Sequence, residues 1–202
     1  MKALVINYGV GNLYSISNAL RRTGFEVFVE VEPRGDVDLI VFPGVGNFKA
    51  VSRYITRYSN ILDELRKKGV AFLGICIGMQ IMFEYSMEGG VPSKGLGWFK
   101  GYVDRIPTKL KLPRIGWDKI KFVENDRCRL FQGLDGKYMY FMHSYMAYTN
   151  DADSICFISE YGDAKIPSMV LKERMIGVQF HPEKSHLNGA EFLKVVFNWL
   201  RV

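Results

Sequence analysis

The sequence predicts an α/β fold with an open, mostly parallel sheet, flanking helices and antiparallel additions in the C-terminal half. In the first half of the chain, short apolar runs rich in β-branched residues alternate with helix-like patterns. From residue 97 to residue 179, aromatic and β-branched segments instead follow one another between turn signals. The chain has 202 residues, 48% of them hydrophobic, which is enough for one buried core. We therefore expect a single domain over residues 1–202.

The alternating half begins with an apolar run that predicts an opening strand. The expected elements are, in chain order, Lys2–Asn7 (strand), Leu13–Arg22 (helix), Glu26–Val31 (strand), Asp38–Phe42 (strand), Tyr54–Lys67 (helix), Val70–Ile75 (strand) and Met79–Tyr85 (helix). The runs LIVF and VAFLGI, in two of these strands, are apolar throughout rather than alternating. Both faces of these strands should be covered, as in the centre of a parallel sheet.

The second half contains segments such as YMYFMHSYMAY and MIGVQF, which predict antiparallel strands. The chain closes with residues 189–200, where Phe192, Val195, Val196 and Trp199 recur at helical spacing. This pattern predicts a final helix that packs one apolar face on the sheet.

The charge of the chain is +6 at pH 7, with a pI near 9.2. The basic residues are scattered, and the densest groups, residues 66–68 and 109–114, lack the interleaved aromatics of a base-stacking surface. We expect no nucleic-acid partner. No apolar run approaches the roughly 20 residues of a membrane helix, and the N-terminus lacks the pattern of a secretory signal. We expect a soluble protein without membrane contact.

The three cysteines, Cys76, Cys128 and Cys156, are widely separated, odd in number and without C-x-x-C spacing. This pattern argues against a disulfide framework and against a zinc site. We expect Cys128 and Cys156 to be small apolar residues in or near the core, and the protein to reside in a reducing cytoplasm.

The segment GICIG, residues 74–78, places Cys76 between two glycines where an apolar strand meets a helical pattern. This is the G-x-nucleophile-x-G form of a nucleophile elbow. The turn should project the sulfur at the C-terminal edge of the sheet and at a helix N-terminus, which favours the thiolate. The N–H of Ile77 can then help to hold an oxyanion. The alternative interpretation is an ordinary buried cysteine.

The segment QFHPE, residues 179–183, places His181 at the end of another apolar strand. From there an imidazole can reach a nucleophile at the end of a neighbouring strand, while Glu183 accepts the second ring N–H and fixes the tautomer. A lone histidine is more often a structural residue. The adjoining HPEK string and the elbow together favour His181 as a general base.

The segment PGVGNF, residues 43–48, follows the strand predicted over residues 38–42. Gly44 and Gly46 on either side of Val45 allow main-chain N–H groups to approach a ligand closely, as an oxyanion hole requires. An ordinary strand-to-loop turn is the alternative. All three segments fall at predicted strand ends, where ligands bind in open parallel sheets.

In these three segments, and over nearly its whole length, the sequence resembles the class I, triad-type glutamine amidotransferases, a flavodoxin-like α/β family. Within the family it is most similar to the glutaminase subunits of imidazole glycerol phosphate synthase. The strings that carry this similarity are NYGVGNLYSISNAL, PGVGNF, GICIGMQ, IGW at 115–117, FMHSY at 141–145 and QFHPEKS.

The resemblance implies a triad of Cys76, His181 and Glu183 that hydrolyses L-glutamine through a cysteinyl thioester, with oxyanion donors from Val45 and Ile77. It implies contacts to glutamine from Gly44, Gly46, Gln80, His143, Ser144 and Tyr145. The residues support these contacts unequally: Gln80 lies one turn beyond Cys76 on the same helix face, whereas core packing is a close alternative for His143 and Tyr145.

The resemblance also implies that no metal or organic cofactor takes part. Ammonia would pass to a separate (β/α)8-barrel cyclase in a heterodimer, which forms imidazole glycerol phosphate and AICAR in histidine biosynthesis. Two other functions stay open: a glutaminase that serves a different acceptor, and a non-catalytic binding subunit of the same fold.

Overall fold

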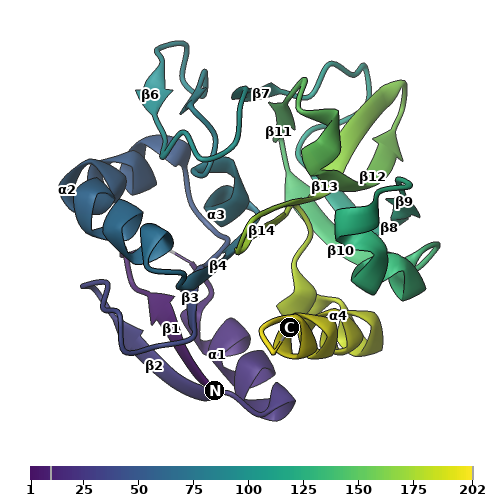
Figure 1. The fold of residues 1–202 in the computed structure, drawn as a ribbon. Helices are drawn as coiled ribbons and strands as arrows, with labels where there is room; N and C mark the ends of the chain where they lie inside the picture. The colour runs from purple at the N-terminus through teal and green to yellow at the C-terminus, as the bar shows by residue number, and fades with distance from the viewer. Residues whose placement is uncertain (10, 202) are drawn as a thin grey trace.

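The computed structural model describes residues 1–9 and 11–201, so Val10 of the opening motif lies outside the described residues. An eight-stranded sheet in the order β2-β1-β3-β4-β14-β13-β12-β9 runs through the molecule (Figure 1). The pairs from β2 to β14 are parallel, and those from β14 to β9 are antiparallel. The predicted sheet, mostly parallel with antiparallel additions in the C-terminal half, is confirmed. Its strands are β1 (Lys2–Ile6), β2 (Glu26–Glu30), β3 (Leu39–Phe42), β4 (Ala71–Ile75), β9 (Lys121–Phe122), β12 (Ile155–Tyr161), β13 (Ala164–Lys172) and β14 (Met175–Val178).

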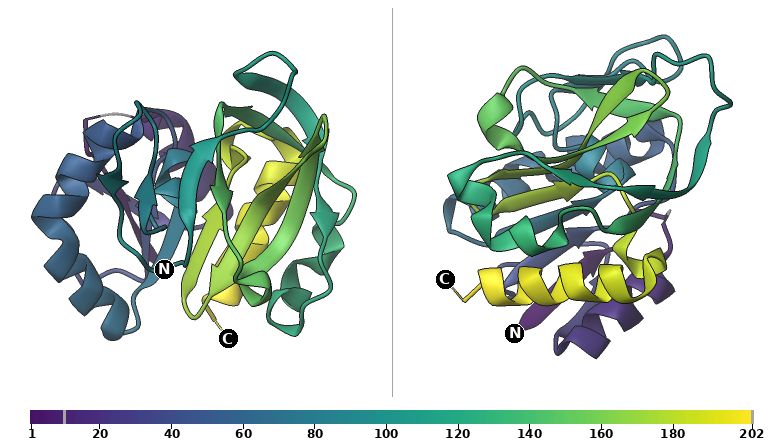
Figure 2. Two further views of the ribbon diagram at one scale, coloured as in Figure 1. Left: turned by 90° about the horizontal axis from the view of Figure 1, so that it is seen from above. Right: turned by 90° about the vertical axis from the view of Figure 1, so that its right-hand side faces the viewer.

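The parallel part of the sheet is covered on both faces, as the continuously apolar runs predict. Successive side chains of a strand point to opposite faces, so Ala3 and Val5 of β1 belong to one apolar cluster and Leu4 and Ile6 to another. Helices α1 (Leu13–Thr23) and α4 (His186–Trp199) lie side by side on the first face (Figure 2), and α2 (Phe48–Lys67) covers the second.

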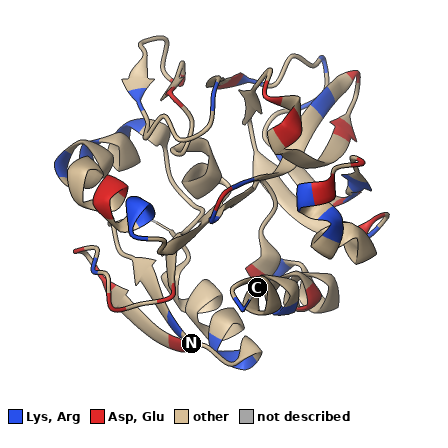
Figure 3. Cartoon of the chain, viewed as in Figure 1, with Lys and Arg blue, Asp and Glu red and all other residues tan. Residues whose placement is uncertain are grey.

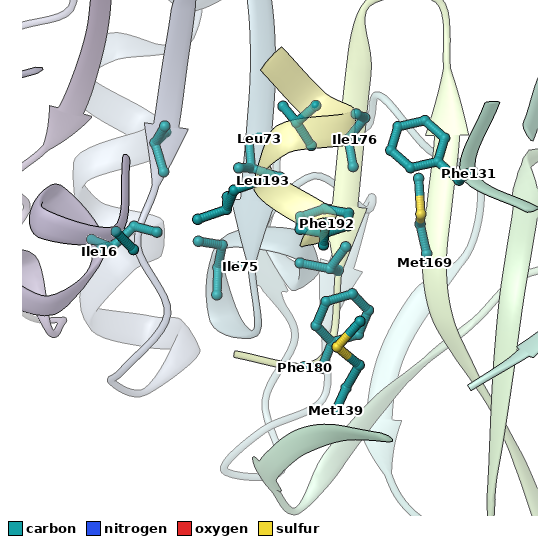
Figure 4. Packing of buried hydrophobic residues seen from close by; sticks show 14 of the residues in the cluster. Ile16, Leu73, Ile75, Phe131, Met139, Met169, Ile176, Phe180, Phe192 and Leu193 are labelled. Carbon is teal, nitrogen blue, oxygen red and sulfur yellow. The ribbon is translucent and has the colours of Figure 1, made fainter. Parts of the chain in front are cut away.

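Helix α4 packs three fully buried side chains, Phe192, Leu193 and Val196, into the first cluster. Phe192 and Leu193 are fully buried against Leu73 of β4 and Ile176 of β14, with Phe180 beside them (Figure 4). The apolar helical spacing in residues 189–200 is therefore the docking face that the sequence predicts, and it holds the segment after β14 against the sheet.

Helix α2 begins six residues before the predicted Tyr54. Asn47 caps it by accepting a hydrogen bond from the Ala50 N–H at 2.8 Å. Phe48 and Val51, in its first turn, are fully buried. The last two residues of PGVGNF are thus the N-cap and the first residue of α2, and they fix the end of the loop that follows β3.

The helix predicted over Met79–Tyr85 is wrong. Helix α3 spans only Ile77–Gln80. Beyond it, the carbonyls of Ile81 and Met82 accept hydrogen bonds from Leu96 and Trp98 instead of from the next helical turn. Tertiary pairing with residues 95–98 therefore ends the helix after one turn.

Two smaller sheets flank the main one. Strands β8 (Arg114–Lys119) and β10 (Tyr138–His143) form an antiparallel pair. Strands β5 (Tyr85–Ser86), β6 (Ser93–Lys94), β7 (Tyr102–Arg105) and β11 (Tyr145–Tyr148) form a sheet in the order β11-β7-β5-β6. Three 3-10 segments complete the fold: η1 (Asp126–Leu134), η2 (Ala152–Ser154) and η3 (Pro182–Lys184).

Cys128 and Cys156 form a disulfide, which corrects the expectation of no disulfide. Their Cα atoms lie 5.4 Å apart although the residues are 28 apart in sequence. Strand β9 pairs with β12, and the chain then turns directly into η1, which returns Cys128 to the flank of β12. Sequence spacing carries no sign of that return. Both residues are buried in the core as expected, but the argument for a reducing compartment can no longer draw on them.

Charged residues are spread over the surface. Figure 3 shows Lys and Arg interspersed with Asp and Glu on most elements, in agreement with their scatter along the sequence. Among residues 1–9 and 11–201, no helix is long and apolar enough to cross a membrane.

Candidate active site

Three neighbouring parallel strands bring the predicted segments together. Strands β3, β4 and β14 lie side by side in the sheet, so their C-terminal ends meet at one edge. The PGVG loop leaves β3, Cys76 leaves β4, and the segment containing His181 leaves β14. A hydrogen bond of 2.7 Å from the Cys76 N–H to the Val178 carbonyl joins the last two.

Cys76 is held in an unusual backbone conformation. Its φ is +50° and its ψ is −107°, a combination that costs a non-glycine residue free energy and that clusters at functional sites. Gly74 and Gly78 make the turn possible by close approach: a Cβ on Gly74 would run into Gly78, and one on Gly78 would run into the Phe42 carbonyl. The two glycines of the elbow are needed for packing, while the positive φ belongs to the cysteine.

His181 and Glu183 form a buried pair. The Nδ1 atom of His181 lies 2.8 Å from Oε1 of Glu183, and the two side chains are 0% and 2% exposed. An ionised carboxylate only accepts hydrogen bonds, so Nδ1 carries the hydrogen. The other ring nitrogen, Nε2, is buried without a hydrogen-bond partner among the described residues. It is left free to exchange a proton.

Two hydrogen bonds hold the backbone of His181 in place, and a glycine leaves room for its ring. The His181 N–H donates to the Tyr140 carbonyl at 2.8 Å, and the Ser185 hydroxyl donates to the His181 carbonyl at 2.7 Å. A Cβ on Gly44 would lie 3.1 Å from Cε1 of His181 and 2.7 Å from the Ile75 carbonyl. Gly44 therefore makes room for the imidazole.

The electrostatics favour a protonated His181. Burial alone would lower the pKa of His181, but the negative charge of Cys76 and the hydrogen bond and charge of Glu183 outweigh it and raise this pKa to about 10. The helix dipole expected behind Cys76 contributes little, because α3 has a single turn. His181 is the cation that faces the sulfur.

A pocket of about 210 Å³ opens over Cys76. This volume is below the roughly 300–1,000 Å³ of sites for drug-sized ligands and fits a small metabolite. The pocket is lined by Gly46, Cys76, Ile77, Gln80, Glu88, Pro113, Met142, His143, Ser144 and Tyr145. Six of the predicted residues thus share the pocket with the cysteine. Gly44 and the histidine pair lie outside its lining, and so does Val45.

A shared carbonyl organises the far wall of the pocket. The Tyr145 carbonyl accepts one hydrogen bond from Nε2 of Gln80 at 3.0 Å and one from Nδ1 of His143 at 2.8 Å. Burial lowers the pKa of His143 to about 3, against the hydrogen bond to Tyr145 and with help from the charge of Arg114. His143 is therefore neutral, with its hydrogen on Nδ1.

The comparisons with known proteins agree with this geometry. Residues 4–199 match the model of the family described as "Glutamine amidotransferase class-I". The chain belongs to the class I glutamine amidotransferase family. It is 54% identical over 201 residues to the "Imidazole glycerol phosphate synthase subunit HisH" of Saccharolobus solfataricus, covering 100% of both chains. The HisH subunit of Pyrococcus furiosus is 42% identical, with 94% of this chain and 95% of that one covered.

Solved structures confirm the class I amidotransferase fold. The "Structure of PurLQS from Thermotoga maritima" superimposes with a TM-score of 0.78 at 19% identity, covering 98% of both chains. A second structure, named "Crystal structure of glutamine amidotransferase", gives a TM-score of 0.74 at 16% identity, with 99% of both chains covered. At these identities the similarity concerns the fold alone.

Sequence reasoning missed several residues of this amidotransferase site. Gln179 is not among the predicted site residues, although it stands two residues before His181, a spacing that puts two side chains on one side of an extended segment. Its Nε2 donates to the Cys76 sulfur at 3.5 Å. Glu88 and Pro113 line the pocket from distant loops, and no local pattern marks them.

Proposed function

We propose that this chain is the glutaminase subunit of an imidazole glycerol phosphate synthase, acting in the cytoplasm in histidine biosynthesis. It would hydrolyse L-glutamine to glutamate and deliver ammonia to a cyclase subunit that forms imidazole glycerol phosphate and AICAR. The full-length similarity to HisH subunits supports the pathway. The observation that carries the chemistry is the buried pair of His181 and Glu183 beside Cys76.

The first half of the reaction forms the thioester. The proton of the Cys76 thiol lies on Nε2 of His181, and the thiolate attacks the carboxamide carbon of glutamine. Glu183 keeps the ring oriented and stabilises the imidazolium. The N–H of Ile77, which has no acceptor within α3 because it opens the helix, and the N–H of Val45 receive the oxyanion. His181 then returns the proton to the leaving nitrogen, and ammonia departs.

The second half regenerates the enzyme. Water enters as ammonia leaves, and Nε2 of His181 removes its proton as it attacks the thioester carbon. A second tetrahedral oxyanion collapses, the carbon–sulfur bond breaks, and glutamate is released. Each step is nucleophilic or acid–base chemistry at Cys76 and His181, so the proposed reaction calls for no metal or organic cofactor.

Glutamine would lie in the pocket above Cys76. Gly46 and the segment His143, Ser144 and Tyr145 supply polar groups around it, and the carboxylate of Glu88 offers an acceptor for the α-ammonium group. Gln80 contributes mainly through its hydrogen bond to the Tyr145 carbonyl, which shapes the wall.

A partner would cover the mouth of this pocket. Ile115 and Trp117 of β8 are exposed apolar residues on one side of the β8–β10 pair, and Ile115 stands opposite Met142 of the pocket. Trp117 stacks on the imidazole of His186 with ring centroids 5.2 Å apart. Exposed aromatics beside a pocket are typical of a protein interface. We propose that the (β/α)8-barrel cyclase binds here and receives the ammonia.

The function is tested by measuring glutamate release by the isolated chain, by its complex with the cyclase, and by the complex loaded with the substrate nucleotide. We expect little activity from the isolated chain and strong activity in the loaded complex, because the loss of one oxyanion donor slows such reactions roughly 100- to 1000-fold and a partner can restore its position. The Cys76→Ala complex should lose synthesis from glutamine and keep synthesis from ammonium salts.

Three outcomes separate the proposal from its alternatives. Equal glutamate release in all three states would indicate a stand-alone glutaminase. Glutamine hydrolysis without any cyclase product would indicate a different acceptor. Binding to the cyclase without glutamine hydrolysis would indicate a non-catalytic subunit.

A further inference from the structure

The sulfur of Cys76 lies at the end of a chain of buried amides that the triad does not include. Nε2 of Gln179 donates to Sγ of Cys76 at 3.5 Å, and Nε2 of Gln80 donates to Oε1 of Gln179 at 3.0 Å. Gln80 also donates to the Tyr145 carbonyl at 3.0 Å. Gln179 is fully buried, and Gln80 is 4% exposed.

The donor and acceptor ends of these two amides follow from the Tyr145 carbonyl, which binds the first of them. A backbone carbonyl only accepts hydrogen bonds, so the amide nitrogen of Gln80 must face Tyr145. The second hydrogen on that nitrogen then points at Gln179, which must present its oxygen. The nitrogen of Gln179 is therefore the end that faces Cys76. The carbonyl of Tyr145 thus determines, through two side chains, that a donor faces the sulfur.

We propose that Gln179 is a catalytic residue that stabilises the Cys76 thiolate through this N–H···S hydrogen bond, with Gln80 as the positioning residue that orients its amide. A hydrogen bond to the charged form of a group favours that form. Because both amides are buried, the donor is already in place when the negative charge develops on sulfur. The inference rests on the proposed glutaminase function for its consequence in catalysis.

Other groups also act on the sulfur. His181 faces Cys76 from the loop after β14. Tyr8, in the loop after β1, interacts with it electrostatically: burial raises the pKa of the Tyr8 hydroxyl, and the charge of Cys76 adds to that increase. His143 is close enough to His181 to interact with it electrostatically, but it is neutral. The amide of Gln179 is a neutral donor that does not titrate. Its removal should therefore shift the titration of the sulfur without removing a titrating group.

The test follows alkylation of Cys76, the free cysteine of the described chain, by iodoacetamide as a function of pH. In Gln179→Met, which keeps the length of the side chain and removes the donor, we expect about 10-fold slower alkylation at neutral pH and a profile displaced upward by about 1 pH unit. Gln179→Glu should be displaced further, because it places a negative charge beside the sulfur. Gln80→Met should be displaced less than Gln179→Met.

A change in structure and a change in thiolate stability have different signatures. If the proposal is correct, all variants reach the wild-type rate at alkaline pH, where the thiolate forms without help, and kcat at neutral pH falls more than KM changes. The control Gln132→Met, on the exposed face of η1, should follow the wild type.

A Gln179→Met profile that superimposes on the wild type, or a rate reduced equally at every pH, would overturn the proposal. Should Gln179→Met fail to fold, Gln80→Met and Gln179→Glu decide on the same criteria. If the wild type hydrolyses no glutamine, the proposed function fails, whereas the alkylation profiles still decide the role of Gln179.

Discussion

The Cys128–Cys156 disulfide gives a prediction whose size follows from the structure. The bond joins residues 28 apart, and in the chain-entropy account a loop of this length stabilises the folded state by about 3.5 kcal/mol. For a chain of this size that difference corresponds to a shift of the melting temperature of about 10 °C. We expect Cys128→Ala, Cys156→Ala and the double variant to lose similar amounts, because each breaks the same cross-link.

The assay is urea unfolding under non-reducing conditions, combined with a thiol count on the denatured, unreduced chain. One of the three cysteines should titrate, namely Cys76. Cys76→Ala, which leaves the disulfide intact, should unfold close to the wild type and serves as the matched control. Three titratable thiols, or a double variant with the wild-type urea midpoint, would refute the reasoning.

Three predictions concern the site itself. Glu183→Gln should lower kcat by about 10²- to 10⁴-fold, and His181→Ala by more, since orientation contributes less than the base; the reverse order in a steady-state assay would contradict these roles. The raised pKa of His181 contributes stability below about pH 6.5 that disappears as the pH rises through about 10. The difference in unfolding free energy between wild type and His181→Gln should accordingly shrink over that range, and a difference that grows with pH would refute the sign. Gly44→Ala should reduce kcat about 10-fold or more, because its Cβ would press on the Ile75 carbonyl and on His181. Gly133→Ala, whose Cβ meets nothing within 4 Å, should leave kcat unchanged.

The sequence predicted the elements whose pattern is local. Each of these patterns lies within a few residues of sequence. They are the continuous apolar strands, the helical spacing in residues 189–200, and the GICIG and QFHPE strings. The parallel arrangement of β3, β4 and β14 then brings Cys76 and His181 to one edge. The order of strands in the sheet therefore accounts for most of the long-range information that brings the histidine and the cysteine together.

What the sequence did not predict depends on contacts between distant segments. Helix α3 stops after one turn because residues 95–98 supply the next hydrogen bonds. The disulfide exists because η1 folds back on β12. Glu88 reaches the pocket through packing that no short motif encodes, and the contact of Gln179 with the sulfur depends on the pairing of β14 with β4. The role of Val45 as an oxyanion donor stays a prediction.

The central claim, that Cys76 is the nucleophile of a glutaminase, is tested most directly by covalent labelling with a chloroketone that mimics glutamine, followed by peptide mapping. We expect the label on the peptide that contains Cys76, and we expect L-glutamine to protect that peptide. Labelling should be slower in His181→Ala, because this variant lacks the imidazole beside the sulfur. Labelling of another residue, or a chain that hydrolyses glutamine at the wild-type rate with Cys76 replaced by alanine, would contradict the claim.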